Sequence, residues 1–123
     1  MQKFMVIIHG PSDCFHSLNT DRRFNEMPEM LEWIRFLSQS GNYVAGETLE
    51  FKGCYVSKEN VESMESMPDN NKIVSACYII LAENPEQAVS IAQTNPAIEN
   101  GTALIEIRPM LPPILAAGQC HNQ

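Results

Sequence analysis

Basic residues are scarce in this sequence, which has 8 lysines and arginines against 15 aspartates and glutamates in its 123 residues. The resulting net charge of -7 argues against nucleic acid and anionic membranes as main partners, because both repel an acidic surface. Long apolar runs are missing too. No stretch reaches the roughly 20 apolar residues of a membrane span, and the first apolar run, 4–8, is too short for a secretion signal. We therefore expect a cytoplasmic protein.

Recognisable site motifs are also missing. There is no glycine-rich phosphate loop, no nucleophile–histidine–acid arrangement with a supported spacing, and no CxxC pair of cysteines. The four cysteines are widely spaced, which predicts reduced thiols in a cytoplasm: Cys14, Cys54, Cys77 and Cys120. We predict no cofactor.

Two groups of residues have the right chemistry for a metal but not the right spacing. His9, Asp13 and His16 could offer imidazole and carboxylate ligands, yet their spacing matches no established metal motif. Cys120 and His121 form a weaker pair at the end of the chain. Polar loop residues are the simpler interpretation of both groups, so we predict no metal site.

What the sequence does contain is a regular succession of apolar patterns. Period-two and continuous apolar runs predict strands, and apolar residues at helical spacing predict helices. The predicted strands are 3–9, 43–51 (interrupted at Gly46), 53–57, 73–82 and 102–108, and the predicted helices are 28–40 and 85–94. Residues 14–25 have no clear hydrophobic period, so we expect an irregular stretch or a short helix there. Residues 58–71 are polar and poorly patterned, and we expect them to be the most mobile or most variable part of the chain.

The helix ends carry recognisable signals. Pro28 suits a first helical position and Gly41 suits the residue just beyond a helix end. Asn84 can cap the second helix, with Gln87 as the reciprocal half of a capping box. Asn95 before Pro96 ends that helix, because the residue before proline disfavours helical backbone.

The order of these elements predicts an α+β fold with a ferredoxin-like βαββαβ plan over residues 1–109. Two helices can cover only one face of the sheet, yet the strands 3–9 and 73–82 are apolar on both faces. A second copy would cover the other face, so we expect a homodimer that pairs sheet to sheet. The alternative is that the C-terminal extension, 110–123, folds over that face. Its apolar residues predict that it packs on the domain or on the dimer partner.

Three segments resemble YCII-related proteins of the DGPF type. They are MQKFMVIIHG at the start, LEWIRFLSQSGNYVAGETL, and ACYIILAENPEQAVSIAQTNPAIENGTALIEIRPM. The middle of the chain matches weakly, so the order and spacing of the segments carry the resemblance. It implies a ferredoxin-like fold and a dimeric α/β barrel, in agreement with the two-faced strands.

The departures from this family bear on function. In this family the DGPF tetrapeptide precedes the third main strand, which corresponds here to the predicted strand 73–82. At that place the sequence has Met-Glu-Ser-Met at 64–67, so the motif is absent. Some relatives carry a histidine on the first helix and an aspartate after the second, a proposed acid–base pair. Those positions correspond to Met30 and Asn95, neither of which exchanges a proton near neutral pH. The acid–base chemistry proposed for those family members is therefore not expected in this chain.

Two functions remain open. The first is a dimeric module that binds a small organic ligand or a protein partner without the family's acid–base pair. The second is a cofactor-free lyase, isomerase or oxygenase acting on a small organic acid or ring compound. Polar side chains on or near the strands are the candidate ligand-binding residues, because they could line a cavity between the helices and the sheet: His9, Glu47, Tyr78 and Arg108, with Glu106 beside them. An exposed strand face explains them equally well.

Overall fold

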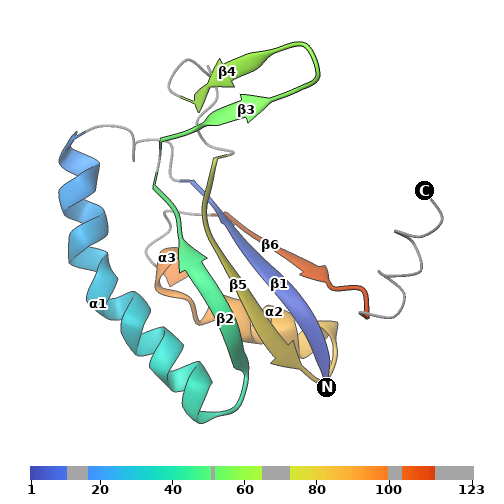
Figure 1. The fold of residues 1–123 in the computed structure, drawn as a ribbon. Coiled ribbons are helices and arrows are strands. Elements are labelled where there is room, and N and C mark those ends of the chain that lie inside the picture. The colour runs from blue at the N-terminus through green and yellow to red at the C-terminus, as the bar shows by residue number, and fades with distance from the viewer. Residues whose placement is uncertain (11–16, 51, 65–72, 100–103, 113–123) are drawn as a thin grey trace.

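The computed structural model describes residues 1–10, 17–50, 52–64, 73–99 and 104–112, with the backbone alone at 17–26 and 99. Figure 1 shows its elements, which in chain order are β1 (Gln2–His9), α1 (Ser17–Gln39), β2 (Tyr43–Thr48), β3 (Cys54–Val56), β4 (Val61–Ser63), β5 (Val74–Ala82), α2 (Pro85–Gln93), α3 (Pro96–Glu99) and β6 (Leu104–Pro109). The predicted α+β class is confirmed.

The main sheet has four strands in the order β2-β5-β1-β6, and every neighbouring pair is antiparallel. β1 and β2 run parallel to each other with β5 between them, so β1-α1-β2 is a split crossover unit. The segment from β5 through α2 and α3 to β6 repeats that arrangement around β1. This interleaving is the order expected from a ferredoxin-like plan.

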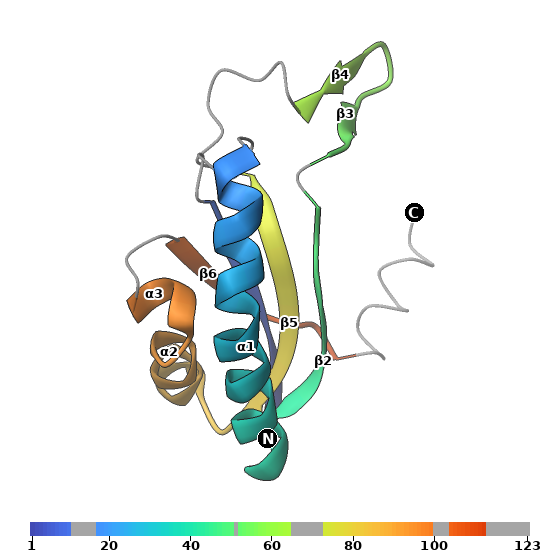
Figure 2. The ribbon, with the colours of Figure 1, turned by 90° about the vertical axis from the view of Figure 1, so that its left-hand side faces the viewer.

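All three helices lie on one side of the sheet, as Figure 2 shows. Phe4, Val6 and Ile8 of β1 point to that side and are buried. The intervening Met5 and Ile7 point to the other side and stay partly exposed. We call this other side the open face. The pairing registers and the alternation place on it Lys3, Met5, Ile7, His9, Ala45, Glu47, Cys77, Ile79, Leu81, Leu104, Glu106 and Arg108.

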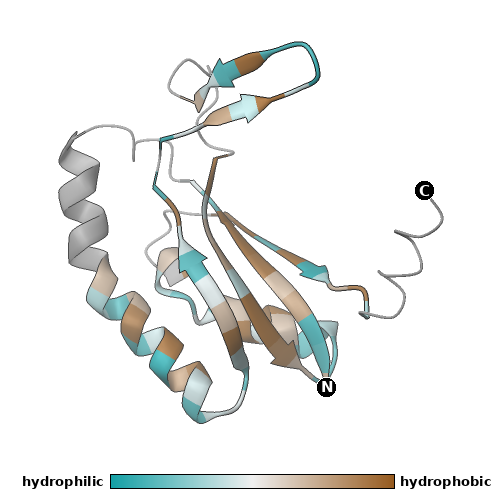
Figure 3. Ribbon diagram, in the orientation of Figure 1, coloured by the Kyte–Doolittle hydropathy of each residue, from teal (hydrophilic) through white to brown (hydrophobic). Residues whose placement is uncertain are grey.

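The core lies between the sheet and the helices. Trp33 and Leu37 of α1 and Ala88 of α2 pack against the buried side chains of β1 and β5. The small alanine side chain lets α2 approach the sheet closely. In Figure 3 the strongest apolar colouring follows β5 and β1, the two central strands. Each fully buried Phe, Val or Ile contributes on the order of 1.5–3 kcal/mol, so these strands anchor the fold.

Helix α1 begins well before the predicted start at Pro28, which lies inside it. A helix can accommodate a proline when packing elsewhere compensates for one lost hydrogen bond. The helix end agrees with the prediction. Gly41 has φ +79°, its N–H donates to Ser38 O at 3.2 Å, and Asn42 N–H donates to Leu37 O at 2.9 Å. These two bonds form a Schellman motif, which requires the left-handed backbone that glycine adopts readily.

Helix α2 has the predicted cap, with one difference. Asn84 Oδ1 accepts the Gln87 N–H at 2.8 Å. Gln87 Oε1 accepts the N–H of Glu83 at 2.6 Å, rather than that of Asn84 as a strict capping box requires. The cap still satisfies amide groups at the helix start, about one turn before the buried Ala88 and two turns before the buried Ala92.

Strand β2 passes Tyr78 at very short range. Gly46 pairs with Tyr78 across the sheet, and the Tyr78 ring lies over the glycine. A Cβ built on Gly46 would stand 2.0 Å from the ring carbon Cδ1. Glycine interrupts the strand pattern at position 46 because any side chain there would collide with the buried Tyr78 ring.

The segment 58–71, predicted to be the most variable part of the chain, contains strand β4. It pairs with β3 as a second, two-stranded sheet with Cys54 opposite Ser63, Tyr55 opposite Glu62 and Val56 opposite Val61. We call this hairpin, residues 54–63, the arm. Strand β3 lies inside the predicted strand 53–57, whereas β4 is too short and too exposed for its periodicity to stand out in the sequence. Residues 65–67, at the expected place of the DGPF motif, and 113–123, most of the C-terminal extension, lie outside the described residues.

Candidate functional site

The helix side of the sheet contains a packed aromatic group. Trp33 of α1 meets Tyr78 of β5 edge to face, with ring centroids 5.4 Å apart, and its Nε1–H donates to Thr94 Oγ1 at 2.8 Å. Tyr43 lies 6.4 Å from Tyr78, and Thr48 Oγ1 is 3.4 Å from the Tyr78 hydroxyl. Both polar ends of the buried Trp33 and Tyr78 are thus satisfied, which is the usual arrangement for an aromatic core residue.

Met30 and Asn95, the positions where the resemblance expects an acid–base pair, touch each other. Asn95 is completely buried, and its Nδ2–H points at Met30 Sδ at 3.7 Å. Its Oδ1 accepts the Ala97 N–H at 2.8 Å and so caps α3. A carboxamide and a thioether do not ionise near neutral pH, so neither can act as an acid or a base there. This contact is a structural polar anchor between α1 and the α2–α3 turn.

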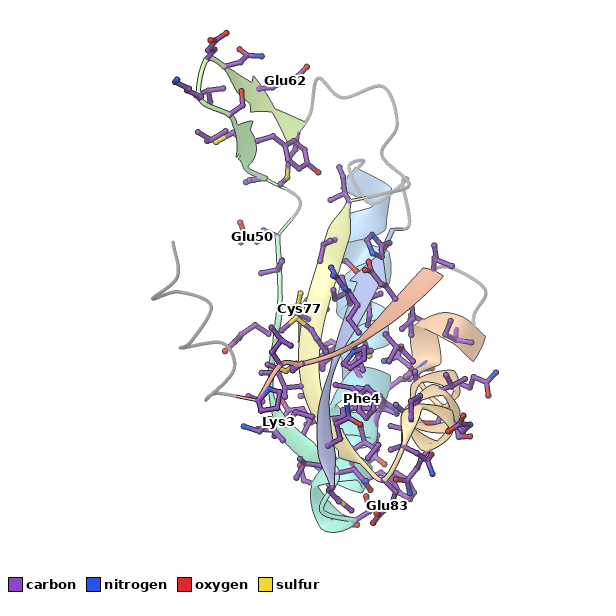
Figure 4. The ribbon with its side chains drawn as sticks, turned by 90° about the vertical axis from the view of Figure 1, so that its right-hand side faces the viewer. Lys3, Phe4, Glu50, Glu62, Cys77 and Glu83 are labelled. Atoms are coloured by element: carbon purple, nitrogen blue, oxygen red, sulfur yellow. The ribbon has the colours of Figure 1, made fainter. Side chains whose placement is uncertain are left out.

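Two further groups stay protonated near neutral pH. Burial raises the pKa of the Tyr43 phenol, and the nearby Tyr78 and Glu47 raise it further. Burial also raises the pKa of the Cys77 thiol, which points to the open face in Figure 4. The thiol form is a poor nucleophile, so Cys77 acts here as a small apolar side chain.

The open face carries a row of charged side chains from its two neighbouring strands β1 and β6. His9 Nε2 is 2.8 Å from Glu106 Oε1, and Arg108 Nε is 3.8 Å from Glu106 Oε2. The side chain of His9 is 19% exposed, that of Glu106 40% and that of Arg108 71%. The register of β1 with β6 explains why these three side chains lie together. Glu106 pairs with Ile7 and Arg108 with Met5, and His9 lies on the same face of β1 as Met5 and Ile7.

This open-face cluster, His9–Glu106–Arg108, has a definite chemical character. A carboxylate beside an imidazole fixes the orientation of the ring through a hydrogen bond. The guanidinium of Arg108 offers several N–H donors toward solvent. Together they could hold a small polar molecule through charged and hydrogen-bonding groups on one face of the sheet.

The predicted site residues therefore separate into two places. His9, Glu47 and Arg108 lie on the open face, whereas Tyr78 is buried in the core on the helix side. The cavity expected between helices and sheet cannot contain all four, because neighbouring strand positions alternate between faces. Sequence reasoning missed Thr94 as the partner of Trp33. Thr94 lies at the end of α2, and nothing in the local sequence indicates that its hydroxyl would contact Trp33.

No three His, Cys, Asp or Glu side chains within the described ranges come together in a way that could hold a metal ion. Asp13, His16, Cys120 and His121 lie outside those ranges. Among the helices that the structure describes, none is long and apolar enough to cross a membrane.

Comparison with known proteins gives a fold relationship. No family model matches the chain, and no curated protein matches it. A solved structure is similar, that of 5-chloro-2-hydroxyhydroquinone dehydrochlorinase (TftG) from Burkholderia phenoliruptrix AC1100 in complex with 2,5-dihydroxybenzoquinone. The match covers 89% of this chain and 93% of that one, with a TM-score of 0.58 and 12% sequence identity. At that identity the similarity shows a distantly related fold alone.

Proposed function

We propose that this chain is a homodimeric binding module of the dimeric α/β-barrel type that takes a small organic ligand without acid–base catalysis at the family's position. The observation that carries the proposal is the contact between Met30 and Asn95. It fills the place of the acid–base pair with two groups that cannot transfer a proton, and Asn95 is completely buried.

The open face supports the homodimer. Its apolar side chains on the central strands β1 and β5 are left uncovered by the helices, which lie on the opposite side. A sheet needs cover on both faces when both are apolar, and a second copy on a two-fold axis supplies a self-complementary surface. The side chains concerned are Met5, Ile7, Cys77, Ile79 and Leu81.

The same face supports the ligand site. On the helix side Tyr78 and Asn95 are buried and hydrogen-bonded, which leaves their polar atoms occupied. His9 and Arg108 reach solvent on the open face. The similar structure holds 2,5-dihydroxybenzoquinone, which makes a flat ring compound with oxygen substituents a reasonable ligand class for this chain too.

A cofactor-free enzyme is the second candidate, and the His9–Glu106 contact of 2.8 Å favours it. An imidazole oriented by a carboxylate is a common general base. In that case His9 would take a proton from a ring hydroxyl or an activated C–H group, and Arg108 would hold the resulting anion.

The homodimer predicts a specific hydrodynamic result. Sedimentation at micromolar concentration should give about twice the 13.8 kDa monomer mass. Ile79→Lys should give a folded monomer, because a lysine in the centre of an apolar interface leaves a charge without a partner. Val89→Lys is the matched control, since Val89 is 44% exposed on α2, and it should remain dimeric. A wild-type monomer would contradict the proposed dimer.

The ligand site predicts a selective thermal shift. We expect 2,5-dihydroxybenzoate, a flat ring carboxylate, to raise the melting temperature of the wild type, with about 2.7 kcal/mol of stabilisation at 100 times Kd. His9→Ala and Arg108→Ala should lose most of the shift and stay dimeric, while Lys58→Ala on the arm should keep it. Equal shifts in all variants would place the ligand elsewhere. Consumption of the probe by the wild type and not by His9→Ala would favour the enzyme.

A further inference from the structure

The arm stands apart from the core of the protein. Every residue from 52 to 63 is exposed, and no arm residue belongs to the buried core. Contacts that hold the hairpin include its cross-strand pairs, the Met64 N–H donating to Gly53 O at 3.0 Å at its base, and the Ser57 N–H donating to Asn60 O at 2.8 Å in its loop. A two-stranded hairpin is only marginally stable in water by itself. Contact with a further surface would therefore stabilise the arm.

One face of the arm is suited to such a surface. Val56 and Val61 lie directly opposite each other and are 73% and 66% exposed, and the Cys54–Ser63 pair shares their side of the hairpin. Tyr55 and Glu62 form the pair on the other side. This alternation gives the arm one mainly apolar face and one mixed face, as expected for a hairpin that covers something.

The position of the arm indicates which surface it meets. Figures 2 and 4 view the molecule from opposite sides, and in both the arm is displaced from the sheet plane toward the open face, away from the helices. Any molecule seated on the open face would therefore lie next to the arm. The arm has one lysine and two glutamates in a chain of net charge -7, so net charge opposes contact with another copy and apolar contact must supply the affinity.

We propose that the arm of each copy packs its Cys54–Val56–Val61 face against the second copy, beside the paired sheets. This inference rests on the homodimer proposed above and adds a second element to its interface. Two-fold symmetry gives both arms the same contact, so the Val56–Val61 pair contributes to the stability of the dimer once in each copy. The arm then extends the interface beyond the sheet faces and closes one end of the space between them.

The first test compares dimer dissociation constants by sedimentation over a concentration series. Val56→Ser with Val61→Ser should weaken the dimer at least about tenfold, because apolar burial is lost in both copies. Glu62→Ser, on the opposite face of the same arm, should change the constant less than about twofold. Circular dichroism should show the same folded sheet signal in all three proteins.

The second test uses the unaltered protein, in case the serine variant merely unravels the arm. Hydrogen exchange of the Val56 and Val61 amides should speed up at least about tenfold on dilution from dimer to monomer, because the arm loses its support. If exchange is independent of concentration and the valine variant dimerises normally, the arm contact is wrong while the dimer stands. If the wild type is a monomer at every concentration, both proposals fail. A different protein captured by the arm of such a monomer would also overturn the inference.

Discussion

Gly46→Ala is expected to destabilise the protein by about 3 kcal/mol, at the upper end of the range for overpacked cores. The new Cβ would stand 2.0 Å from Tyr78 Cδ1. Tyr78 is 1% exposed and held by Trp33 on its edge, so the ring cannot move aside without disturbing the core. Strand β2 would have to separate locally from β5. Chemical denaturation should show a lower midpoint with an unchanged slope.

A double-mutant cycle attributes this loss to the ring. Tyr78→Leu removes the atoms that a Cβ at position 46 would meet, so Gly46→Ala should cost much less in that background. Tyr78→Phe keeps the same ring carbons and should leave the cost of Gly46→Ala nearly unchanged. If the cost is the same in the leucine background, the clash is not its cause, and a general strand effect of alanine must be responsible.

Asn95→Asp is expected to cost about 3–5 kcal/mol at neutral pH, the range for a buried charge without a partner. Asn95 is completely buried, and its side-chain neighbours are the Met30 sulfur and the Ala97 N–H. Neither neighbour carries a compensating positive charge. Asn60→Asp is the matched control, because it makes the same chemical change at an exposed position of the arm loop. It should change stability by less than about 0.5 kcal/mol.

The loss should depend on pH in a definite direction. Burial raises the pKa of the introduced carboxyl above its unfolded value of about 3.9. The neutral acid resembles the amide in shape, so the variant should be close to normal below pH 4 and lose stability as pH rises through the folded pKa. Thermal melts of wild type and variant from pH 4 to 8 measure this difference. A constant difference over that range would argue against a buried carboxylate.

Adding Met30→His to Asn95→Asp provides a stricter check of the contact. The imidazole would stand where Met30 Sδ now meets Asn95, and a protonated ring would offset the buried carboxylate. The double variant should recover at least about 1 kcal/mol relative to Asn95→Asp alone. No recovery would mean that the two side chains are not close enough to interact.

The sequence alone predicted much of the local structure, because its signals are local. The strand at 3–9, the end of the first helix at Gly41 and the cap of the second at Asn84 all depend on residues within one or two turns. The first strand of the arm lies inside the predicted strand 53–57, but β4 was missed because a three-residue strand shows too little alternation. The early start of α1 was missed because Pro28 looked like a first helical position.

The candidate site was only partly predictable. His9, Glu106 and Arg108 were recognised as strand-borne polar groups, but their meeting depends on the pairing of β1 with β6, nearly a whole chain length apart in sequence. Met30 and Asn95 were connected through the resemblance to a family, and the residues themselves gave no sign that a thioether and an amide would touch.

The sequence by itself determined the two apolar sets of β1, Phe4 with Val6 and Ile8, and Met5 with Ile7. Only the tertiary structure decided which set faces the helices. Strand alternation puts the two sets on opposite faces of the sheet, but it does not determine which face the helices cover. That choice follows from packing: Trp33, Leu37 and Ala88 fit against Phe4 and Tyr78, and Gly46 leaves room for the Tyr78 ring. It also places His9 and Arg108 on the open face instead of between helices and sheet.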